Sequence, residues 1–337
     1  MRNELLELDA EILAAASVVG KKEREGPLGE RFDLCDPDDR FGQKTWEGAE
    51  SEMQRLAFNT VLAKAGCKDT DVEALFAGDL LNQCVGSSYG LLDFNVPYFG
   101  LYGACSTSAE GLMLAAALVT GGLCSLCGAV TSSHYCSAER QYRTPLEYGG
   151  QRPPTAQWTV TAAGAFLVQK PSLPSGKARA ILRRGMPGIV VDKGVRDANN
   201  MGAAMAPAAL DTLVRFFRAT NTGPEDYDRI VTGDLGYEGG KLLCELIRLE
   251  GYEIADRYAD CGQMIYFRTE QDVHGGGSGC GCAASVLAAE LLPKLLMQGG
   301  MHRMLFLPTG AMMSPDSIKQ GQNIPAIAHL LEIVSNY

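Results

Sequence analysis

Short apolar runs separated by turns of small and polar residues recur along the chain and predict alternating strands and helices. Leu75–Leu80 is typical of a buried strand that ends in a Gly-Asp turn. Ala109–Thr120 is rich in Ala, Leu and Met with little charge, and a Gly-Gly pair follows it, which predicts a buried helix. Cys127–Ser132 predicts the next strand. Strands alternating with buried helices indicate an α/β protein whose mixed sheet is covered on both faces.

The same three blocks recur in the same order later in the chain. Ile230–Leu235 repeats the strand and its Gly-Asp turn, and the second predicted helix runs from Ala283 to Gln298 before Gly299-Gly300. Leu305–Gly310 repeats the strand that follows. Three ordered matches with similar spacing indicate an internal duplication. We expect two copies of one strand–helix unit, with their central helices back to back in an α/β/α/β/α arrangement around a pocket beside Cys105.

The duplication suggests where the copies begin and end. Residues 1–170 would form the N-terminal copy and residues 178–337 the C-terminal copy. Between them, around Gln169–Ala180, prolines and a glycine interrupt the pattern and predict a linker. Residues 138–158 predict a long irregular insertion in the first copy. Long loops in compact domains are usually functional, so we expect this one to act as a lid or a subunit contact.

Charge and hydropathy exclude several classes of protein. The 337 residues carry a formal net charge of −10, and such a surface repels phosphate backbones, so we predict no nucleic-acid binding. No apolar segment approaches the roughly 20 residues of a membrane helix. The first residues are acidic, where a secretory signal would be basic. We therefore expect the protein to fold in the cytoplasm or an equivalent compartment.

Eleven cysteines raise the question of a metal or of disulfides. Two close pairs exist, Cys124 with Cys127 and Cys280 with Cys282. A structural zinc site needs two such pairs in loops, usually with histidine. The first pair instead lies at the start of an apolar predicted strand, which argues against zinc. Free buried thiols in a reducing compartment are the better interpretation. We predict neither a metal nor a cofactor.

Cys105 is the strongest candidate for chemistry. It stands at the start of a predicted buried helix, where the helix dipole stabilises a thiolate. Ser106 and the two hydroxyl residues after it can cap this helix or line a pocket. His134 follows the strand Cys127–Ser132 and could approach Cys105, although a lone histidine is more often structural. The alternative for Cys105 is a buried position in a helix–helix contact.

The second copy lacks the groups that an acyl-transfer site would need. No histidine follows the turn at Asp234, and no asparagine follows the glycines Gly275–Gly277. A Cys–His site needs a base and an oxyanion donor from this side, and Asp234 has the wrong charge for that task. The glycine run also fails as a dinucleotide motif, because Cys282 stands at the third glycine. These absences favour a degenerate nucleophile position.

Arginines in the predicted insertion suggest an anionic ligand. Arg140 and Arg143 lie just after His134, and guanidinium groups suit carboxylates. Arg152, Lys193 and Arg196 are further cations in this acidic chain. Most surface arginines are merely solvated, so this interpretation rests on their position.

Several of these segments together resemble the stage V sporulation protein AD family of spore-forming Firmicutes. The matching motifs are Gly103–Ser108, Thr131–His134, Ala138–Gln141, Glu147–Gln151, Met201–Pro207, Gly276–Cys280 and Thr309–Ala311. The resemblance covers nearly the whole chain and is weakest over the first twenty residues. It implies a thiolase-like fold, the same duplicated five-layer arrangement that the repeat predicts. In thiolases and ketoacyl synthases the position of Cys105 is the acylated nucleophile.

The resemblance implies a non-enzymatic role in spores. The protein would bind pyridine-2,6-dicarboxylic acid (dipicolinic acid), alone or as its calcium chelate, for uptake into the forespore with other stage V sporulation A membrane proteins. It would be a homodimer, as thiolase-like proteins usually are, and peripheral at the forespore or spore inner membrane. The alternatives are a condensing enzyme that transfers acyl groups through Cys105, and a scaffold that only dimerises and docks partners.

A site that binds a planar ring with two carboxylates needs guanidinium groups, hydroxyl or N–H donors at a helix start, and an aromatic or apolar wall. With calcium, Asp79, Glu139 or Asp234 could complete an oxygen shell. The candidate ligand-binding residues lie in the turns and loops named above: Asp79, Asn82, Cys105, Ser106, His134, Glu139, Arg140, Arg143, Asp234 and Ser278.

Overall fold

One large mixed sheet organises the chain. The computed structural model describes residues 4–142, 152–172 and 178–336. Eleven of the strands in these ranges form the sheet, in the order β4-β3-β5-β7-β1-β8-β15-β12-β9-β10, with β2 (Leu34–Cys35) beside β1. Besides β2, five strands of this sheet come from the first half of the chain: β1 (Leu6–Val19), β3 (Ala74–Gly78), β4 (Tyr98–Leu101), β5 (Leu126–Ser133) and β7 (Ala162–Gln169). Their counterparts in the second half are β8 (Ala180–Met186), β9 (Arg229–Thr232), β10 (Tyr258–Asp260), β12 (Arg303–Leu307) and β15 (Leu330–Ser335).

The strand directions repeat between the two halves. In the first half β3 is parallel to β4 and β5, whereas β5 and β1 are antiparallel to β7. In the second half β9 is parallel to β10 and β12, whereas β12 and β8 are antiparallel to β15. The halves join where β1 pairs antiparallel with β8, with Ile12 opposite Ala180. This mirrored order confirms the predicted duplicated α/β fold.

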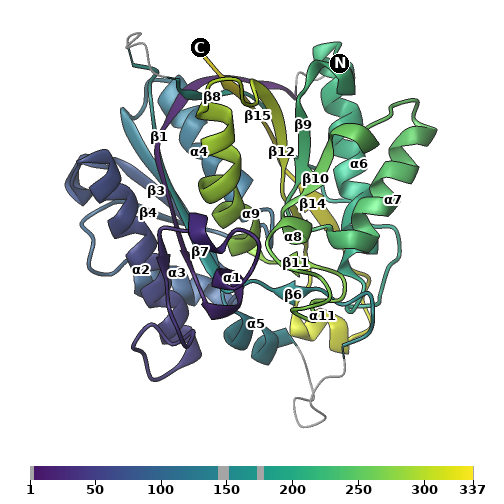
Figure 1. Cartoon of the computed structure of the whole chain (residues 1–337), viewed down its shortest axis with the longest axis horizontal. Coiled ribbons are helices and arrows are strands. Elements are labelled where there is room, and N and C mark those ends of the chain that lie inside the picture. The colour runs from purple at the N-terminus through teal and green to yellow at the C-terminus, as the bar shows by residue number, and fades with distance from the viewer. Residues whose placement is uncertain (1–3, 143–151, 173–177, 337) are drawn as a thin grey trace.

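Helices cover both outer faces and fill the space between the half-sheets. Helices α4 (Thr107–Thr120) and α9 (Cys280–Val286) belong to one central hydrophobic cluster with strands of both halves. Helix α2 (Trp46–Ala65) forms a second cluster on the outer face of the first half-sheet. Helices α6 (Met201–Thr220) and α7 (Gly236–Leu249) form a third cluster with the second half-sheet. Figure 1 shows α2 and the α6–α7 pair on opposite sides of the molecule.

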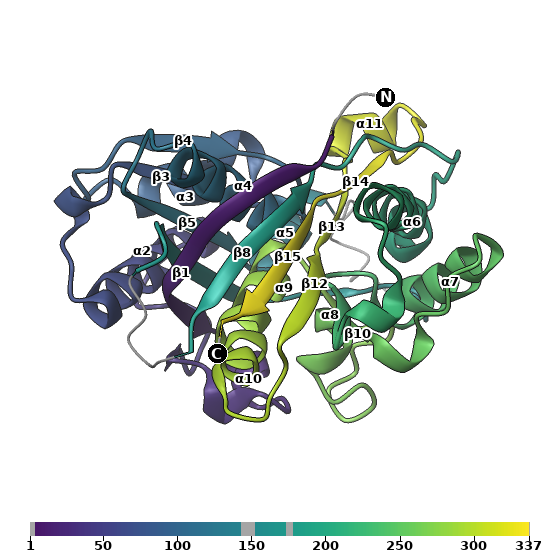
Figure 2. The same ribbon diagram turned by 90° about the horizontal axis from the view of Figure 1, so that it is seen from above.

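Small residues let the central helices approach the sheet. Gly281 begins α9 directly against β7, and a Cβ there would lie 2.0 Å from the carbonyl oxygen of Ala162. Only glycine fits this contact, because a methyl group would overlap with backbone. The contact holds the start of α9 beside the ends of β5 and β7, and Figure 2 shows the central helices beneath the curved sheet. The glycine-rich run before α9 therefore packs the two halves together.

Around the junction of the halves, several short elements surround the turn that contains Cys105. They are α3 (Val85–Gly90), α5 (Tyr135–Tyr142), β6 (Trp158–Thr159), β11 (Gly277–Ser278), β13 (Thr309–Ala311), β14 (Ala326–Ala328) and α11 (Pro315–Lys319). Strand β6 pairs with β11 across the halves, with Thr159 opposite Ser278. The region predicted as an irregular insertion thus begins in helix α5 and ends in a strand. Its residues 143–151 lie outside the described part of the chain.

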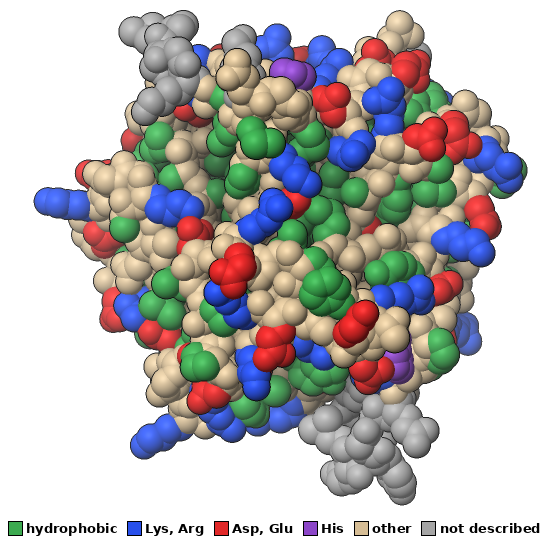
Figure 3. Space-filling model, viewed as in Figure 1, with side chains coloured by type: hydrophobic (Ala, Val, Ile, Leu, Met, Phe, Trp, Pro, Cys, Tyr) green, Lys and Arg blue, Asp and Glu red, His purple; other side chains and the backbone are tan. Residues whose placement is uncertain are grey.

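Other expectations from the sequence concern the linker, the cysteines and the surface. Residues 170–179 connect β7 to β8, and 173–177 lie outside the described ranges. All eleven cysteines are free thiols. Within residues 4–142, 152–172 and 178–336, no cluster of three His, Cys, Asp or Glu side chains could hold a metal, and no helix is long and apolar enough to cross a bilayer. Acidic and basic side chains are interspersed over the face shown in Figure 3.

Candidate functional site

A pocket opens beside Cys105 where the two halves meet. Its volume is about 310 Å³, and residues from both halves line it. The turn before α4 brings Cys105 to the floor of the pocket, because Ala104 adopts the left-handed conformation with φ of 48°. The Ser106 hydroxyl donates a hydrogen bond to the carbonyl of Gly103 at 2.6 Å and so fixes this turn. Ser106 is fully buried and shapes the turn, while Cys105 itself reaches the pocket.

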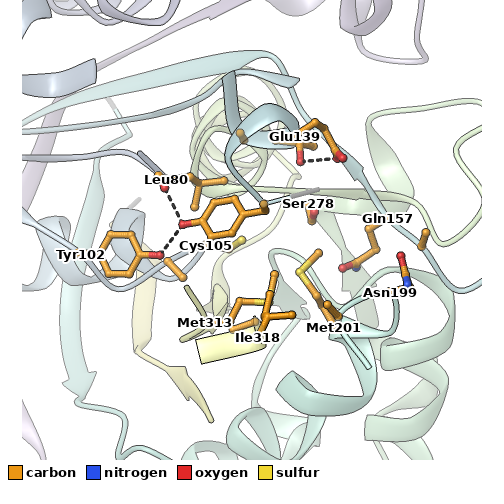
Figure 4. Close-up of a pocket in the computed structure, with 17 residues that line it drawn as sticks. Leu80, Tyr102, Cys105, Glu139, Gln157, Asn199, Met201, Ser278, Met313 and Ile318 are labelled. Atoms are coloured by element: carbon orange, nitrogen blue, oxygen red, sulfur yellow. Dashed lines mark hydrogen bonds between the residues drawn. The ribbon is translucent and has the colours of Figure 1, made fainter. Parts of the chain in front are cut away.

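Two tyrosines form one wall of the pocket. The Tyr142 hydroxyl, on α5, donates to the carbonyl of Leu80 at 2.7 Å (Figure 4). Because this uses its only proton, the hydroxyl of Tyr102 donates to Tyr142, 2.9 Å away. Burial raises the pKa of Tyr142 to about 12, so this pair is neutral at physiological pH. This wall therefore presents aromatic rings to the pocket, while both tyrosine hydroxyls already donate hydrogen bonds within the protein.

The opposite wall is apolar, and polar groups gather at one end. Met201, Met313 and Ile318 face the tyrosines across the pocket in Figure 4. Gln157 and Asn199 lie at one end, and the Gln157 side-chain nitrogen donates to the backbone carbonyl of Asp234 at 2.5 Å. The Gln157 side-chain oxygen is buried without a hydrogen-bond partner. A ligand could satisfy this oxygen with a donor or a cation.

Glu139 and Ser278 complete the polar part of the pocket. Glu139 projects from α5, and the Thr159 hydroxyl donates to its carboxylate at 3.3 Å. Ser278 lies on β11 of the second half. Among the described residues that line the pocket there is no lysine, arginine or histidine. The described lining is thus mainly apolar, with one acidic side chain.

The Cys105 thiol is neutral in this setting. Burial raises its pKa well above the ordinary value, and the nearby Asp234 carboxyl raises it further. The backbone N–H of Gly279 lowers it by less. The sequence favoured a thiolate at the helix start, but loss of hydration outweighs the helix dipole at a position that is only 5% exposed.

Asp234 lies behind Cys105 and outside the pocket. It follows β9, is fully buried, and neither carboxyl oxygen makes a hydrogen bond, although backbone N–H groups of Thr309 and Gly279 lie nearby. Burial and the neighbouring Asp260 raise the pKa of Asp234 well above its usual range. Burial therefore disfavours the charged form of this acid beside the thiol.

Asp79, the counterpart of Asp234 in the first half, has a different role. Its carboxylate accepts hydrogen bonds from the backbone of Leu81 at 2.8 Å and from the backbone and hydroxyl of Ser87 at 2.7 and 2.6 Å. Asp79 is fully buried and does not line the pocket. Its oxygens close the turn after β3 and are not available to a calcium ion in the pocket.

His134 also lies outside the pocket. Its Nδ1 accepts the backbone N–H of Cys136 at 3.2 Å, so Nε2 carries the proton and donates to the carbonyl of Asp39 at 2.8 Å. Its ring lies 5.5 Å from that of Trp46. Burial lowers the pKa of His134, so the imidazole is neutral. This histidine fastens the start of α5 to the segment before α2 and turns away from Cys105.

Asn82 and Arg140 surround a second cavity on the other side of α5. This cavity has a volume of about 150 Å³. Arg140 forms an ion pair with Glu47, and the Asn82 backbone donates to the Gln141 side chain at 3.0 Å. Arg143 lies outside the described residues. Of the nine candidate residues within the described ranges, the structure brings Cys105, Glu139 and Ser278 into the pocket beside the thiol.

Comparison with solved structures shows the fold. The chain matches a cerulenin-bound OleA from Xanthomonas campestris with a TM-score of 0.61 and 15% identity, covering 98% of this chain and 97% of the other. It matches AbyA1, a tetronic acid condensing enzyme, with a TM-score of 0.58 and 14% identity, covering 96% and 99%. These neighbours are thiolase-like condensing enzymes, so the predicted thiolase-like fold is confirmed. At such low identity the likeness concerns the fold alone.

Comparison of sequences is more specific. The chain is 41% identical over 316 residues to Stage V sporulation protein AD of Bacillus subtilis strain 168, which spans 94% of this chain and 91% of the relative. The family model for Stage V sporulation protein AD (SpoVAD) matches residues 2–334. The chain with a buried thiol between two duplicated halves thus belongs to the Stage V sporulation protein AD family, a family of sporulation proteins.

Proposed function

We propose that the pocket beside Cys105 binds dipicolinic acid as its calcium chelate, for uptake into the forespore during sporulation. The shape of the pocket supports this ligand. Tyr102 and Tyr142 face Met313 and Ile318 across a space of about 310 Å³. A planar pyridine ring can pack between an aromatic wall and an apolar wall. Membership in a sporulation family supports the biological context.

The charge of the lining favours the chelate over the free acid, and this observation carries the proposal. The described lining contains Glu139 and no lysine or arginine. A free dianion would meet this carboxylate without a compensating cation, whereas a one-to-one chelate with Ca²⁺ is neutral. Carboxylate and amide oxygens are typical calcium ligands, and Glu139, Gln157 and Asn199 present them from neighbouring parts of the wall.

Binding without catalysis is favoured over the condensing-enzyme alternative. An acyl-transfer enzyme needs a thiolate or a base beside its thiol. Here burial raises the pKa of Cys105, and the described lining lacks histidine. We therefore infer that Cys105 contributes to the shape of the binding pocket.

Isothermal titration calorimetry tests this proposal. We expect dipicolinate with equimolar calcium to bind at one site per chain, and calcium-free dipicolinate with a chelator to bind at least about tenfold more weakly. Benzene-1,3-dicarboxylate with calcium lacks the ring nitrogen that completes the chelate and should not bind. Met313→Trp should abolish binding by filling the pocket, and Glu139→Gln should reduce the advantage that calcium gives.

Arg140→Ala is a matched control on the same helix, because Arg140 pairs with Glu47 on the other side of α5. Its affinity should equal that of the unaltered protein. Tighter binding of the calcium-free dianion would contradict the proposed chelate. Transfer of an acyl group from acyl-CoA to Cys105, detected by peptide mass spectrometry, would favour the enzyme instead.

We further propose a homodimer, and contact with other stage V sporulation A membrane proteins at the forespore or spore inner membrane. Strand β4 supports the dimer because it ends the sheet on one side and carries exposed aromatic residues. The membrane partners rest on family membership.

A further inference from the structure

Two cysteines lie close together where the chain returns from the central helix α4 to the sheet. Helix α4 ends in a glycine turn, and Cys124 lies between this turn and β5, which contains Cys127. The N–H groups of Leu123 and Cys124 donate to the carbonyl of Leu118 at 2.9 and 3.4 Å, which folds the turn back onto α4. The pair therefore lies at the far end of α4 from Cys105 and outside the described lining of the pocket.

Both thiols face the same side of the sheet. Cys127 belongs to the central hydrophobic cluster between the half-sheets, whereas Leu126 beside it packs against the outer cluster around α2. In a regular strand, residues three apart face opposite sides. The chain bends at Ser125, however, and Cys124 also packs against the central cluster. The bend thus brings the two sulphur atoms together on the α4 side of β5.

The two thiols interact but differ in their access to solvent. Cys127 is fully buried, whereas Cys124 is half-buried. Burial, followed by the charge of the Cys124 thiolate and a hydrogen bond to that side chain, raises the pKa of Cys127 to about 12. A disulfide requires Cβ atoms about 3.5–4.5 Å apart, and thiols that share a hydrogen bond lie close to this arrangement. Cys124 can therefore meet a reagent from solvent while Cys127 lies beside it.

Redox chemistry suits this pair better than metal binding. A structural zinc ion needs four ligands. In the part of the chain that the structure describes, no third cysteine, histidine, aspartate or glutamate joins these two thiols in a cluster that could hold a metal. Both cysteines are reduced in the structure, so they are available for oxidation. Two cysteines separated by two residues can close a small disulfide ring when a half-buried thiol reacts first.

We propose that Cys124 and Cys127 form a reversible dithiol–disulfide site, which small disulfides such as oxidised glutathione oxidise. Deprotonated Cys124 attacks the small disulfide, bonds to one of its sulphur atoms and releases the other half as a thiol. Deprotonated Cys127 then attacks the Cys124 sulphur and releases the second half as a thiol. The protein loses two electrons and two protons, and the small disulfide gains them. The bridge ties the turn after α4 to β5, and it does not depend on the proposed function.

Thiol mapping tests this site in the whole chain without any ligand. The protein is incubated with excess oxidised glutathione, the remaining thiols are alkylated with iodoacetamide in denaturant, and peptide mass spectrometry locates each cysteine. We expect a cross-link between Cys124 and Cys127 that dithiothreitol reverses. Because the second step needs the Cys127 thiolate, the rate of cross-linking should rise about tenfold for each pH unit below the raised pKa of this thiol.

Other cysteines of the chain serve as internal controls. The exposed Cys35 should acquire glutathione without forming a cross-link. Cys280 and Cys282 are close in sequence and fully buried, but their thiols donate to the carbonyls of Ala104 and Gly233 at 3.2 and 3.4 Å and so point apart. This second pair should stay reduced while the protein is folded.

Two variants separate the steps of the reaction. Cys127→Ala keeps a small apolar side chain in the core but removes the second thiol, so glutathione should accumulate on Cys124. Cys124→Ser should leave Cys127 reduced, because the remaining thiol is buried. Urea denaturation adds a second measurement. The cross-linked protein should unfold at a higher urea concentration than the reduced protein, and Cys127→Ala that carries glutathione should not.

Two results would overturn the dithiol–disulfide site. One is unaltered protein that, after the reaction has levelled off, carries glutathione on Cys124 while Cys127 is alkylated. The other is a pair that stays fully reduced under conditions that modify Cys35. If a variant does not fold, the cysteine map of the unaltered protein decides by itself. All measurements use ligand-free protein, so failure of chelate binding and failure of this site are distinguishable.

Discussion

Burial decides the chemistry of Cys105. A cysteine at a helix start is often activated, because the helix dipole favours the thiolate. In this chain the thiol is 5% exposed and has the buried acid Asp234 behind it. Desolvation disfavours the charged form and is the larger effect. We therefore expect the Cys105 thiol to react slowly with electrophiles near neutral pH.

Alkylation kinetics test the state of Cys105. We expect iodoacetamide to modify Cys105 much more slowly than the exposed Cys35 near neutral pH, with a rate that still rises at alkaline pH. Asp234→Asn should increase the Cys105 rate, because it removes the acidic neighbour but keeps the shape of the side chain. Peptide mass spectrometry resolves the eleven thiols. A Cys105 rate that has already reached its plateau near neutral pH would show a lowered pKa and contradict this account.

Some site residues could be predicted from sequence and others could not. Cys105 and Ser278 stand in small-residue turns before helices, and such turns mark places where backbone and ligand come close. Tyr102 and Gln157 were not predicted, because they reach the pocket only through long-range packing between β4, β6 and the second half. His134 shows the opposite failure. It follows strand β5 as the sequence indicates, but nothing in the sequence reveals that its ring bonds to the Asp39 carbonyl and lies outside the pocket.

At the level of elements, β4 is an exposed edge strand. It pairs with β3 on one side and ends the described sheet on the other. The exposed fractions of Tyr98 and Phe99 are 37% and 51%. Leu75 donates its N–H to the Pro97 carbonyl, so residues alternating from Pro97 face β3, and the N–H groups of Tyr98 and Gly100 point outward. An unpaired apolar edge of this kind is a template for a second strand.

Gly100→Pro tests whether this edge forms the proposed homodimer. Proline removes an outward N–H without disturbing the ladder to β3. A side chain at Gly100 meets only Tyr98, so Gly100→Ala is a matched control that keeps the N–H. We expect the unaltered protein and Gly100→Ala to sediment as dimers and Gly100→Pro as a monomer. A monomer for all three at micromolar concentration, or a dimer for Gly100→Pro, would exclude β4 as the interface.

Elements with their own local signal were predictable, and those without it were not. The equivalent strands β3 and β9 each lead into a Gly-Asp turn, and α4 and α9 follow matching small-residue turns. The duplication is therefore visible in the sequence. Strands β1 and β8 join the halves, yet neither shows such a local signal in the sequence. When a strand pairs on both sides with segments far away in the chain, its own residues do not identify those partners.

At the scale of the whole molecule, buried acids couple the fold to pH. Burial raises the pKa of Glu23 to about 7, of Glu50 to about 8 and of Asp260 to about 7. The oxygens of Glu23 include one that is buried without a hydrogen bond, and its other oxygen binds Tyr266 and the N–H of Thr161. These acids come from both halves and from the segment after β1. The fold therefore retains protons that the unfolded chain has already lost at neutral pH.

This retention predicts that the free energy of unfolding falls as pH rises from about 6.5 to about 9. Acids with raised pKa values stabilise the fold fully below their ordinary pKa, and that contribution is lost as pH rises through the folded-state values of about 7 to 8. The buried His329 acts only at lower pH, since burial lowers its pKa to about 4 and the unfolded histidine is neutral above about 6.5. Urea denaturation should show a decrease on the order of 2 kcal/mol across this range.

Glu50→Gln should flatten part of this decrease, because the pKa of Glu50 is the highest of these three and so Glu50 titrates most completely within the range. Asp260→Asn should flatten a smaller part. Stability that is constant or rises over this range would show that these acids are already ionised in the folded protein, and the proton assigned to Glu50 would have to be withdrawn.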